Sequence, residues 1–232
     1  NFGSLLEAVD RLGLRNNTLV IFTSDHGDML YSQDRGWKCK PWRESVIVPF
    51  IVRWPGRVSA GTSESTPFGL VDAMPTLLRL CCAAIPDEVE GLDLSHLLLG
   101  QAGFRPASQI IHQHLCPNTF SFREWRGVVT ATHTYARFRG EPWVMYDDRA
   151  DPYQLANLAG CSGSRDLEAE LEAELNSCLE RLDDPFETSE EVATRYKLDL
   201  DYRGIYPCYY QPELMKEMQR RAGERPERMR KS

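Results

Sequence analysis

The feature of the sequence that most limits its fold is an uninterrupted apolar run, L-V-I-F, at residues 19–22, bounded by the polar stretches N-N-T and T-S-D. Such a run is typical of a strand buried on both faces, as in a parallel sheet. It follows residues 5–12, whose apolar side chains recur at helical spacing, and Gly13 stands where that helix would end. A helix followed by a buried strand is half of an α/β unit, so the sequence predicts an α/β fold.

Side chains able to bind a metal follow this strand directly. In open α/β sheets, ligands bind beyond the carboxyl ends of the strands, which is where Asp25 and His26 emerge. Neighbouring side chains of a strand point to opposite faces, so these two can share an ion only if the chain turns, and Gly27 fits such a turn. The alternative is an ordinary polar turn in which Asp25 accepts local backbone hydrogen bonds. Asp28 is expected to orient the turn rather than to bind an ion.

Composition excludes several classes of protein. The net charge of −7, from 27 basic and 34 acidic residues, gives no sign of nucleic-acid binding. The seven cysteines are odd in number and have no C-x-x-C spacing, so we expect mostly free thiols. No apolar run approaches the about 18 residues that a membrane span needs. The chain enters a helical pattern directly after Asn1, so we expect a fragment of a larger fold. Any export signal would lie upstream, and the compartment and oligomeric state are left open.

The later part of the chain predicts a second, smaller unit. Four short runs rich in β-branched and aromatic residues, between residues 108 and 147, indicate a small antiparallel sheet. Residues 164–182 have the pattern of an amphipathic helix. Its apolar stripe consists of Leu167, Leu171, Leu175, Cys178 and Leu182. We therefore expect the end of a large α/β domain at 1–100, a sheet-and-helix subdomain at 101–185, and an extended tail at 186–232 whose last residues, about 15 of them, are disordered.

Two further groups of residues allow a functional and an ordinary interpretation. His112 and His114 alternate along a predicted strand and face the same side, a geometry that could bind a metal. The favoured interpretation is that both are polar residues on one strand face. Arg123 and Arg126 flank Trp125 and could line the path of an anionic substrate, but exposed arginines beside a strand are the favoured interpretation.

A series of motifs in fixed order resembles the sulfatase family of the alkaline-phosphatase superfamily. The series is S-D-H-G-D, a lysine three residues before P-W-R-E-S, and V-P-F-I-V-R-W-P-G, which contains an expected second strand at 46–53. It continues with G-L-V-D-A-M-P-T-L-L-R-L-C, G-L-D-L-S-H-L-L-L-G and Y-D-D-R-A-D-P-Y-Q-L-A-N-L. The resemblance covers about residues 4–160. It implies part of an alkaline-phosphatase-like mixed sheet sandwiched by helices, followed by the small α+β subdomain.

The resemblance also implies roles for particular residues. Asp25 and His26 stand at a pair of metal ligands, and the ion in this family is usually calcium. A histidine ligand leaves magnesium, manganese or zinc as alternatives. Lys38 stands at the lysine that contacts the sulfate ester, and is therefore the expected catalytic and substrate-binding residue. Lys40 is a less favoured occupant of that position because of its spacing to P-W-R-E-S.

The chain also departs from the family pattern. The family's C-x-P-S-R or S-x-P-S-R motif, whose first residue becomes the nucleophile formylglycine, does not occur here. We expect that motif in a missing amino-terminal part, and the chain alone to be inactive. The resemblance thus implies part of a sulfuric ester hydrolase that acts on a sulfate ester. A phosphatase or phosphodiesterase of the same superfamily, and a truncated product that catalyses nothing, are the alternatives.

Overall fold

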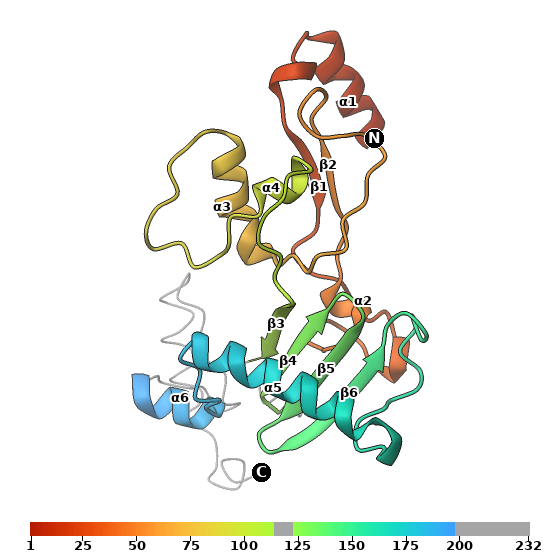
Figure 1. Ribbon diagram of the computed structural model, residues 1–232, viewed down its shortest axis with the longest axis vertical. Helices are drawn as coiled ribbons and strands as arrows, with labels where there is room; N and C mark the ends of the chain where they lie inside the picture. Colours follow the sequence, from red (N-terminus) through yellow and green to blue (C-terminus); the bar gives the residue numbers. More distant parts are fainter. Residues whose placement is uncertain (114–122, 198–232) are drawn as a thin grey trace, which may run out of the picture.

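The structure of the protein is a computed structural model, and it describes residues 1–113 and 123–197 (Figure 1). His114 and the tail beyond residue 197 lie outside the described residues. In chain order the elements are α1 (Phe2–Arg11), η1 (Arg15–Asn17), β1 (Val20–Thr23), η2 (Ser32–Asp34), α2 (Arg43–Val46), β2 (Phe50–Arg53), α3 (Leu70–Leu80), α4 (Ser95–Leu98), β3 (Ser108–Gln113), β4 (Trp125–Thr130), β5 (His133–Phe138), β6 (Glu141–Asp147), η4 (Ser162–Ser164), α5 (Arg165–Arg181) and α6 (Ser189–Tyr196). No helix in these two described stretches is long and apolar enough to cross a membrane.

The apolar run forms strand β1, which pairs with β2 in antiparallel register. The carboxylate of Asp10 in α1 accepts hydrogen bonds from Arg53 in β2 at 2.6 and 2.9 Å, which ties the helix to the strand pair. Burial of β1 on both faces was a wrong prediction for the described structure, since Phe22 is 42% exposed. Among the described residues this sheet contains only β1 and β2, and Phe22 contacts Phe2 of α1 with ring centroids 5.2 Å apart.

The second predicted strand begins later than its apolar pattern suggested. We expected a strand over residues 46–53, but the structure forms the short helix α2 up to Val46 and begins strand β2 at Phe50. Pro49 directly precedes the strand and has no backbone N–H to donate to a neighbouring strand.

Helix α3 is joined to the segment after it by one buried carboxylate. Asp72, 2% exposed, accepts hydrogen bonds from the backbone N–H of Gly69 at 3.0 Å and of Leu92 at 2.8 Å. It also accepts from the side chain of Gln109 in β3 at 2.6 Å. Three separate segments therefore meet at this side chain.

The small antiparallel sheet predicted from the sequence has the strand order β3-β4-β5-β6, and every neighbouring pair is antiparallel. Helix α5 lies across one face of it (Figure 1). The predicted stripe of α5 is buried at Leu171, Leu175 and Cys178. Leu182 follows the end of the helix and is 47% exposed, so it does not extend the stripe.

The two faces of this sheet carry two different clusters. Side chains alternate along a strand, so Tyr135 and Met145 pack with α5 while Ala136 and Val144 point to the opposite face. On that opposite face the cluster consists of Met29, Trp42, Trp125, Ala136, Val144 and Tyr146. Met29 and Trp42 come from the loop between β1 and β2. The loop that contains the predicted site residues is therefore anchored on the sheet, on the face away from α5.

Arg126 occupies a different environment from the exposed one expected for it. Its side chain is 0% exposed and pairs with Asp184 through Nε at 2.5 Å and Nη2 at 3.2 Å. Its guanidinium also lies 4.5 Å from the ring centroid of Phe186. Arg123 is 56% exposed, as expected. The pattern of the strand did not indicate the ion pair because Asp184 lies 58 residues further along the chain.

Candidate active site

The turn after β1 is organised by its own polar groups. Asp25 accepts the backbone N–H of His26 at 2.9 Å, and the Ser24 hydroxyl donates to the His26 carbonyl at 2.9 Å. The His26 Nδ1 atom lies 2.7 Å from the Gly27 carbonyl, which can only accept, so Nδ1 carries a proton. In the neutral ring this leaves a lone pair on Nε2, which faces Lys38 in the neighbouring loop.

The structure brings together the three residues that the sequence singled out. The Lys38 ammonium lies 2.7 Å from His26 Nε2, and the Asp25 Oδ2 atom lies 3.4 Å from the same nitrogen. The side chain of Asp25 is 83% exposed and that of His26 is 39% exposed. A carboxylate, an imidazole and an ammonium therefore share one accessible place on the surface of the chain.

The environment of Asp25 favours its ionised form. Desolvation raises the pKa of Asp25. Hydrogen bonds from the backbone N–H of His26 and from the Ser24 hydroxyl are among the interactions that lower this pKa by more than desolvation raises it. The net pKa lies below the usual value for an aspartate. The carboxylate is thus charged at neutral pH and able to bind a cation.

Gly27 is required by the close approach of two backbone segments. Its N–H donates to the Ser45 carbonyl at 2.9 Å, and a Cβ atom at this position would lie only 1.9 Å from the Glu44 carbonyl oxygen. From the sequence, we expected Gly27 to allow a sharp turn of the backbone. In the structure, glycine is needed there because no side chain fits against the Glu44 carbonyl. This contact joins the metal-competent turn to helix α2.

Lys40, the alternative lysine, points elsewhere. It is only 4% exposed, and its ammonium lies 3.5 Å from the Lys38 carbonyl. Its backbone N–H donates to the Ser45 hydroxyl at 3.3 Å. Of the two lysines, Lys38 is the one whose ammonium lies beside His26.

Sequence reasoning missed the residues that hold this loop on the sheet. The Trp42 indole N–H donates to the Tyr146 hydroxyl at 3.1 Å, and the Arg43 backbone N–H donates to the side chain of Gln154 at 2.9 Å. Both partners belong to the run Y-D-D-R-A-D-P-Y-Q-L-A-N-L. The only available signal was that this run belongs to the series of motifs, and its partners lie more than 100 residues away.

The residues present fit part of a metal site. Asp25 Oδ2 and His26 Nε2 are 3.4 Å apart, a separation at which one ion can bind both. Nε2 already faces a positive charge, the Lys38 ammonium. No group of three or more His, Cys, Asp or Glu side chains suited to a metal occurs within residues 1–113 and 123–197. These two residues would therefore offer two of the about six to eight ligands that a calcium ion takes.

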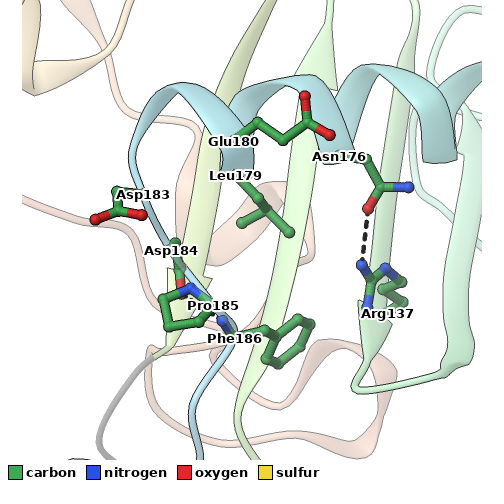
Figure 2. Close-up of a pocket in the computed structure, with 8 residues that line it drawn as sticks. All are labelled: Arg137, Asn176, Leu179, Glu180, Asp183, Asp184, Pro185 and Phe186. Carbon is green, nitrogen blue, oxygen red and sulfur yellow. Dashed lines mark hydrogen bonds between the residues drawn. The ribbon is translucent and has the colours of Figure 1, made fainter.

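Other candidate features lie apart from this place. His112 is exposed on β3, where it is opposite Arg126. A cavity of about 560 Å³ lies at the carboxyl end of α5 (Figure 2). It is lined by Arg137, Asn176, Leu179, Glu180, Asp183, Asp184, Pro185 and Phe186. None of the predicted site residues lines this cavity.

Comparison with known proteins agrees with the geometry. The sequence model of the family described as "N-sulphoglucosamine sulphohydrolase, C-terminal" matches residues 34–181. The ulvan-active sulfatase of Formosa agariphila is 36% identical over an alignment of 203 residues that covers 84% of this chain and 39% of that protein. The endo-4-O-sulfatase of Bacteroides thetaiotaomicron is 34% identical over an alignment of 215 residues that covers 84% of this chain and 41% of that protein. The chain thus spans about two fifths of the length of these relatives.

Solved structures resemble the chain in fold as well. One is a structure in complex with its substrate D-glucosamine-2-N,6-O-disulfate, with a TM-score of 0.71 and 26% identity over 79% of this chain and 38% of that one. Another, from work on glycosaminoglycan metabolism by Bacteroides thetaiotaomicron, has a TM-score of 0.72 and 34% identity over 84% of this chain and 43% of that one. Together with the family match over residues 34–181, these likenesses place the chain in the sulfatase family, as a carboxyl-terminal part of such a protein.

Proposed function

We propose that the complete protein containing this chain hydrolyses a sulfate ester, and that Asp25, His26 and Lys38 help to bind the sulfo group. The observation that carries the proposal is the Lys38 ammonium, 2.7 Å from His26 Nε2 and beside the ionised Asp25. A sulfo group is a tetrahedral anion, and positive charge fixed in advance around its oxygens stabilises the additional charge of the transition state.

Asp25 and His26 are the residues that would hold a metal ion, and we propose calcium. Asp25 contributes an ionised oxygen ligand, the type that calcium and magnesium prefer, while His26 leaves manganese and zinc as alternatives. A divalent ion held there supplies charge that polarises the ester oxygens. Because the Nε2 lone pair cannot bind an ion and accept from Lys38 at once, Lys38 would release Nε2 when the ion binds and donate to the other side of the sulfo group instead. The remaining ligands would come from outside the described residues.

The nucleophile is proposed to be a formylglycine in the part of the protein that this chain does not span. Neither C-x-P-S-R nor S-x-P-S-R occurs in the sequence, and the chain spans about two fifths of the relatives it matches. The chain supplies one side of the site and the rest of the protein supplies the attacking group. We therefore expect no turnover by the chain alone.

We propose a sulfated carbohydrate as the substrate. Three relatives at 30 to 36% identity are described as an ulvan-active sulfatase, an endo-4-O-sulfatase and an N-acetylglucosamine-6-O-sulfatase. The structure with a TM-score of 0.71 holds a sulfated glucosamine as its substrate. Relatives named steryl-sulfatase or arylsulfatase also match, but they cover 43 to 68% of this chain, against 84% for the ulvan-active sulfatase and the endo-4-O-sulfatase. The longer matches support a sugar as the part of the ester that leaves.

Sulfate release by the complete protein tests the proposal. The wild type, in the presence of calcium, should release sulfate from a glucosamine 6-sulfate and not phosphate from the matching 6-phosphate. Asp25→Ala should abolish the release and weaken calcium binding measured by calorimetry. Asp28→Asn is the matched control, since its side-chain oxygen can still accept the Leu30 N–H at 2.8 Å. Equal activity of the Asp25→Ala variant, or preference for the phosphate, would contradict the proposal.

A further inference from the structure

Gln154 is a polar side chain enclosed by the protein at the junction of the sheet and the site loop. Its exposed fraction is 0%, and its backbone has a left-handed conformation with φ of 53°. Such a conformation costs a residue other than glycine about 1 to 2 kcal/mol, so the surrounding contacts must hold it in place. The residue follows β6 by seven positions and lies in the run that also contains Asn157.

Every polar group of the Gln154 side chain is used. Its Oε1 accepts the backbone N–H of Arg43 at 2.9 Å, and its Nε2 donates to Asp148 at 2.7 Å. Its own backbone carbonyl accepts the side chain of Gln33 at 2.9 Å. An amide can donate and accept at once, which this arrangement needs, whereas a carboxylate would face the carboxylate of Asp148.

These contacts hold the site loop on both sides of Lys38. Gln33 lies five residues before Lys38 and Arg43 lies five residues after it. Arg43 begins helix α2, whose Ser45 accepts the Gly27 N–H with its carbonyl and the Lys40 N–H with its hydroxyl. The Gln154 side chain therefore fixes the helix that also fixes the turn of Asp25 and His26.

We propose that Gln154 is a positioning residue for the sulfo-binding site, whose side chain acts through Arg43 on the distance between Lys38 and His26, while its backbone carbonyl holds Gln33. The proposal rests on the proposed function, since it assigns the site that Gln154 serves. Gln154 itself is enclosed and is not proposed to contact the substrate. Displacement of a catalytic group by about 1 Å is expected to cost on the order of a hundredfold in rate.

Asn157, which is exposed where Gln154 is enclosed, offers a control from the same run of residues. Its side chain makes three hydrogen bonds, where that of Gln154 makes two: it accepts from Met145 N at 2.9 Å and Ala159 N at 3.0 Å and donates to the Trp143 carbonyl at 2.9 Å. None of these three contacts reaches the site loop. A loss of stability alone should therefore appear in variants of both residues.

The test compares Gln154→Met and Asn157→Leu in the complete protein, since both substitutions retain volume and remove hydrogen bonds. In Gln154→Met, hydrogen exchange of the Arg43 amide should be at least about tenfold faster, and kcat/KM for the sulfated sugar should fall about 10 to 100 fold at equal folded fraction. Asn157→Leu should change neither by more than about threefold.

Exchange of the Arg43 amide and kcat/KM for the sulfated sugar together distinguish failure of this proposal from failure of the proposed function. Equal loss of kcat/KM in the two variants, or an unchanged Arg43 amide in Gln154→Met, would overturn the positioning role. If the wild type releases no sulfate, the proposed function fails, and the exchange of the Arg43 amide still decides whether Gln154 holds the loop. Gln154→Gly removes the backbone cost together with the side chain, so recovery of slow exchange in that variant would also contradict the role.

Discussion

At the scale of the residue, the site depends on how closely two backbone segments approach. Gly27 and Glu44 are so near that no side chain fits between them, and the Gly27 N–H completes the contact through Ser45. This approach brings the turn with His26 to the loop with Lys38. The identity of one small residue thereby decides whether an imidazole and an ammonium can meet at 2.7 Å.

Substitution of Gly27 by alanine should disrupt both stability and the site. The added Cβ would lie 1.9 Å from a backbone oxygen, which cannot rotate away as a side chain could. We expect a loss of about 1 to 3 kcal/mol in the free energy of unfolding, measured by denaturant titration, and a lower affinity for calcium. Gly3→Ala is the control, because a methyl group added to Gly3 in α1 would meet no atom within 4 Å. It should stabilise by about 0.5 to 1 kcal/mol, and an equal loss in both variants would contradict the explanation.

At the scale of the element, buried and exposed ion pairs join segments with very different strengths. Arg126 in β4 is fully enclosed and pairs with Asp184 in the segment between α5 and α6. Arg123 pairs with Glu141 at 3.0 Å, but both side chains are more than half exposed. Removal of one partner leaves an uncompensated buried charge in the first pair, whereas solvent screens the second, so the costs of breaking the two pairs should differ by several kcal/mol.

Asp184→Ala should therefore be strongly destabilising. It leaves the Arg126 guanidinium enclosed without its carboxylate and removes the acceptor of the Phe186 N–H at 2.8 Å. We expect a loss of about 3 to 5 kcal/mol, measured by chemical denaturation at neutral pH. Glu141→Gln should change stability by at most about 1 kcal/mol. Similar losses of stability in the two variants would show that the cost of breaking an ion pair here does not depend on the enclosure of Arg126.

The ion pair between Glu64, in the loop before α3, and Arg105, in the segment before β3, should make a contribution to stability that depends on pH. Hydrogen bonds from Arg105 and from the Thr66 hydroxyl and N–H lower the pKa of Glu64 to about 2. A lowered folded-state pKa gives stability that is present above the unfolded value near 4.5 and lost as the pH falls towards about 2. Glu64→Gln should reduce stability by at most about 1 kcal/mol at pH 7, since both partners are partly exposed, and by almost nothing at pH 2. A difference that is equal at pH 7 and pH 2 would exclude this linkage.

At the scale of the whole molecule, one sheet organises both parts of the described chain. Its first face packs on α5 and its second face holds the loop that carries the site residues. The four-stranded sheet is connected to the loop with Lys38 by two hydrogen bonds. Trp42 donates to Tyr146 in β6, and Arg43 donates to Gln154, which follows β6. Mutations in the sheet are expected to affect the site through this loop.

Local patterns in the sequence predicted the elements and the candidate residues, but not their distant partners. The spacing of Leu171, Leu175 and Cys178 was enough to predict the buried stripe of α5, since neighbours on a helix face are neighbours in the sequence. The partners of Arg126 and Arg43 lie 58 and 111 residues away, and no local pattern contains them. The place of Lys38 was inferred from a resemblance, and its approach to His26 depends on Gly27 and α2 together.

Binding of the sulfo group by Lys38, beside Asp25 and His26, can be checked through kcat/KM for sulfate release by the complete protein carrying Lys38→Ala or Lys40→Met. Lys38→Ala should lower kcat/KM by about 10² to 10³ fold, as loss of a donor to the transition state does. Lys40→Met, compared at equal folded fraction, should retain most of the activity, because the Lys40 ammonium lies by a backbone carbonyl rather than beside His26. Near-normal release by Lys38→Ala together with loss in Lys40→Met would show that the sulfo group is bound by the other lysine.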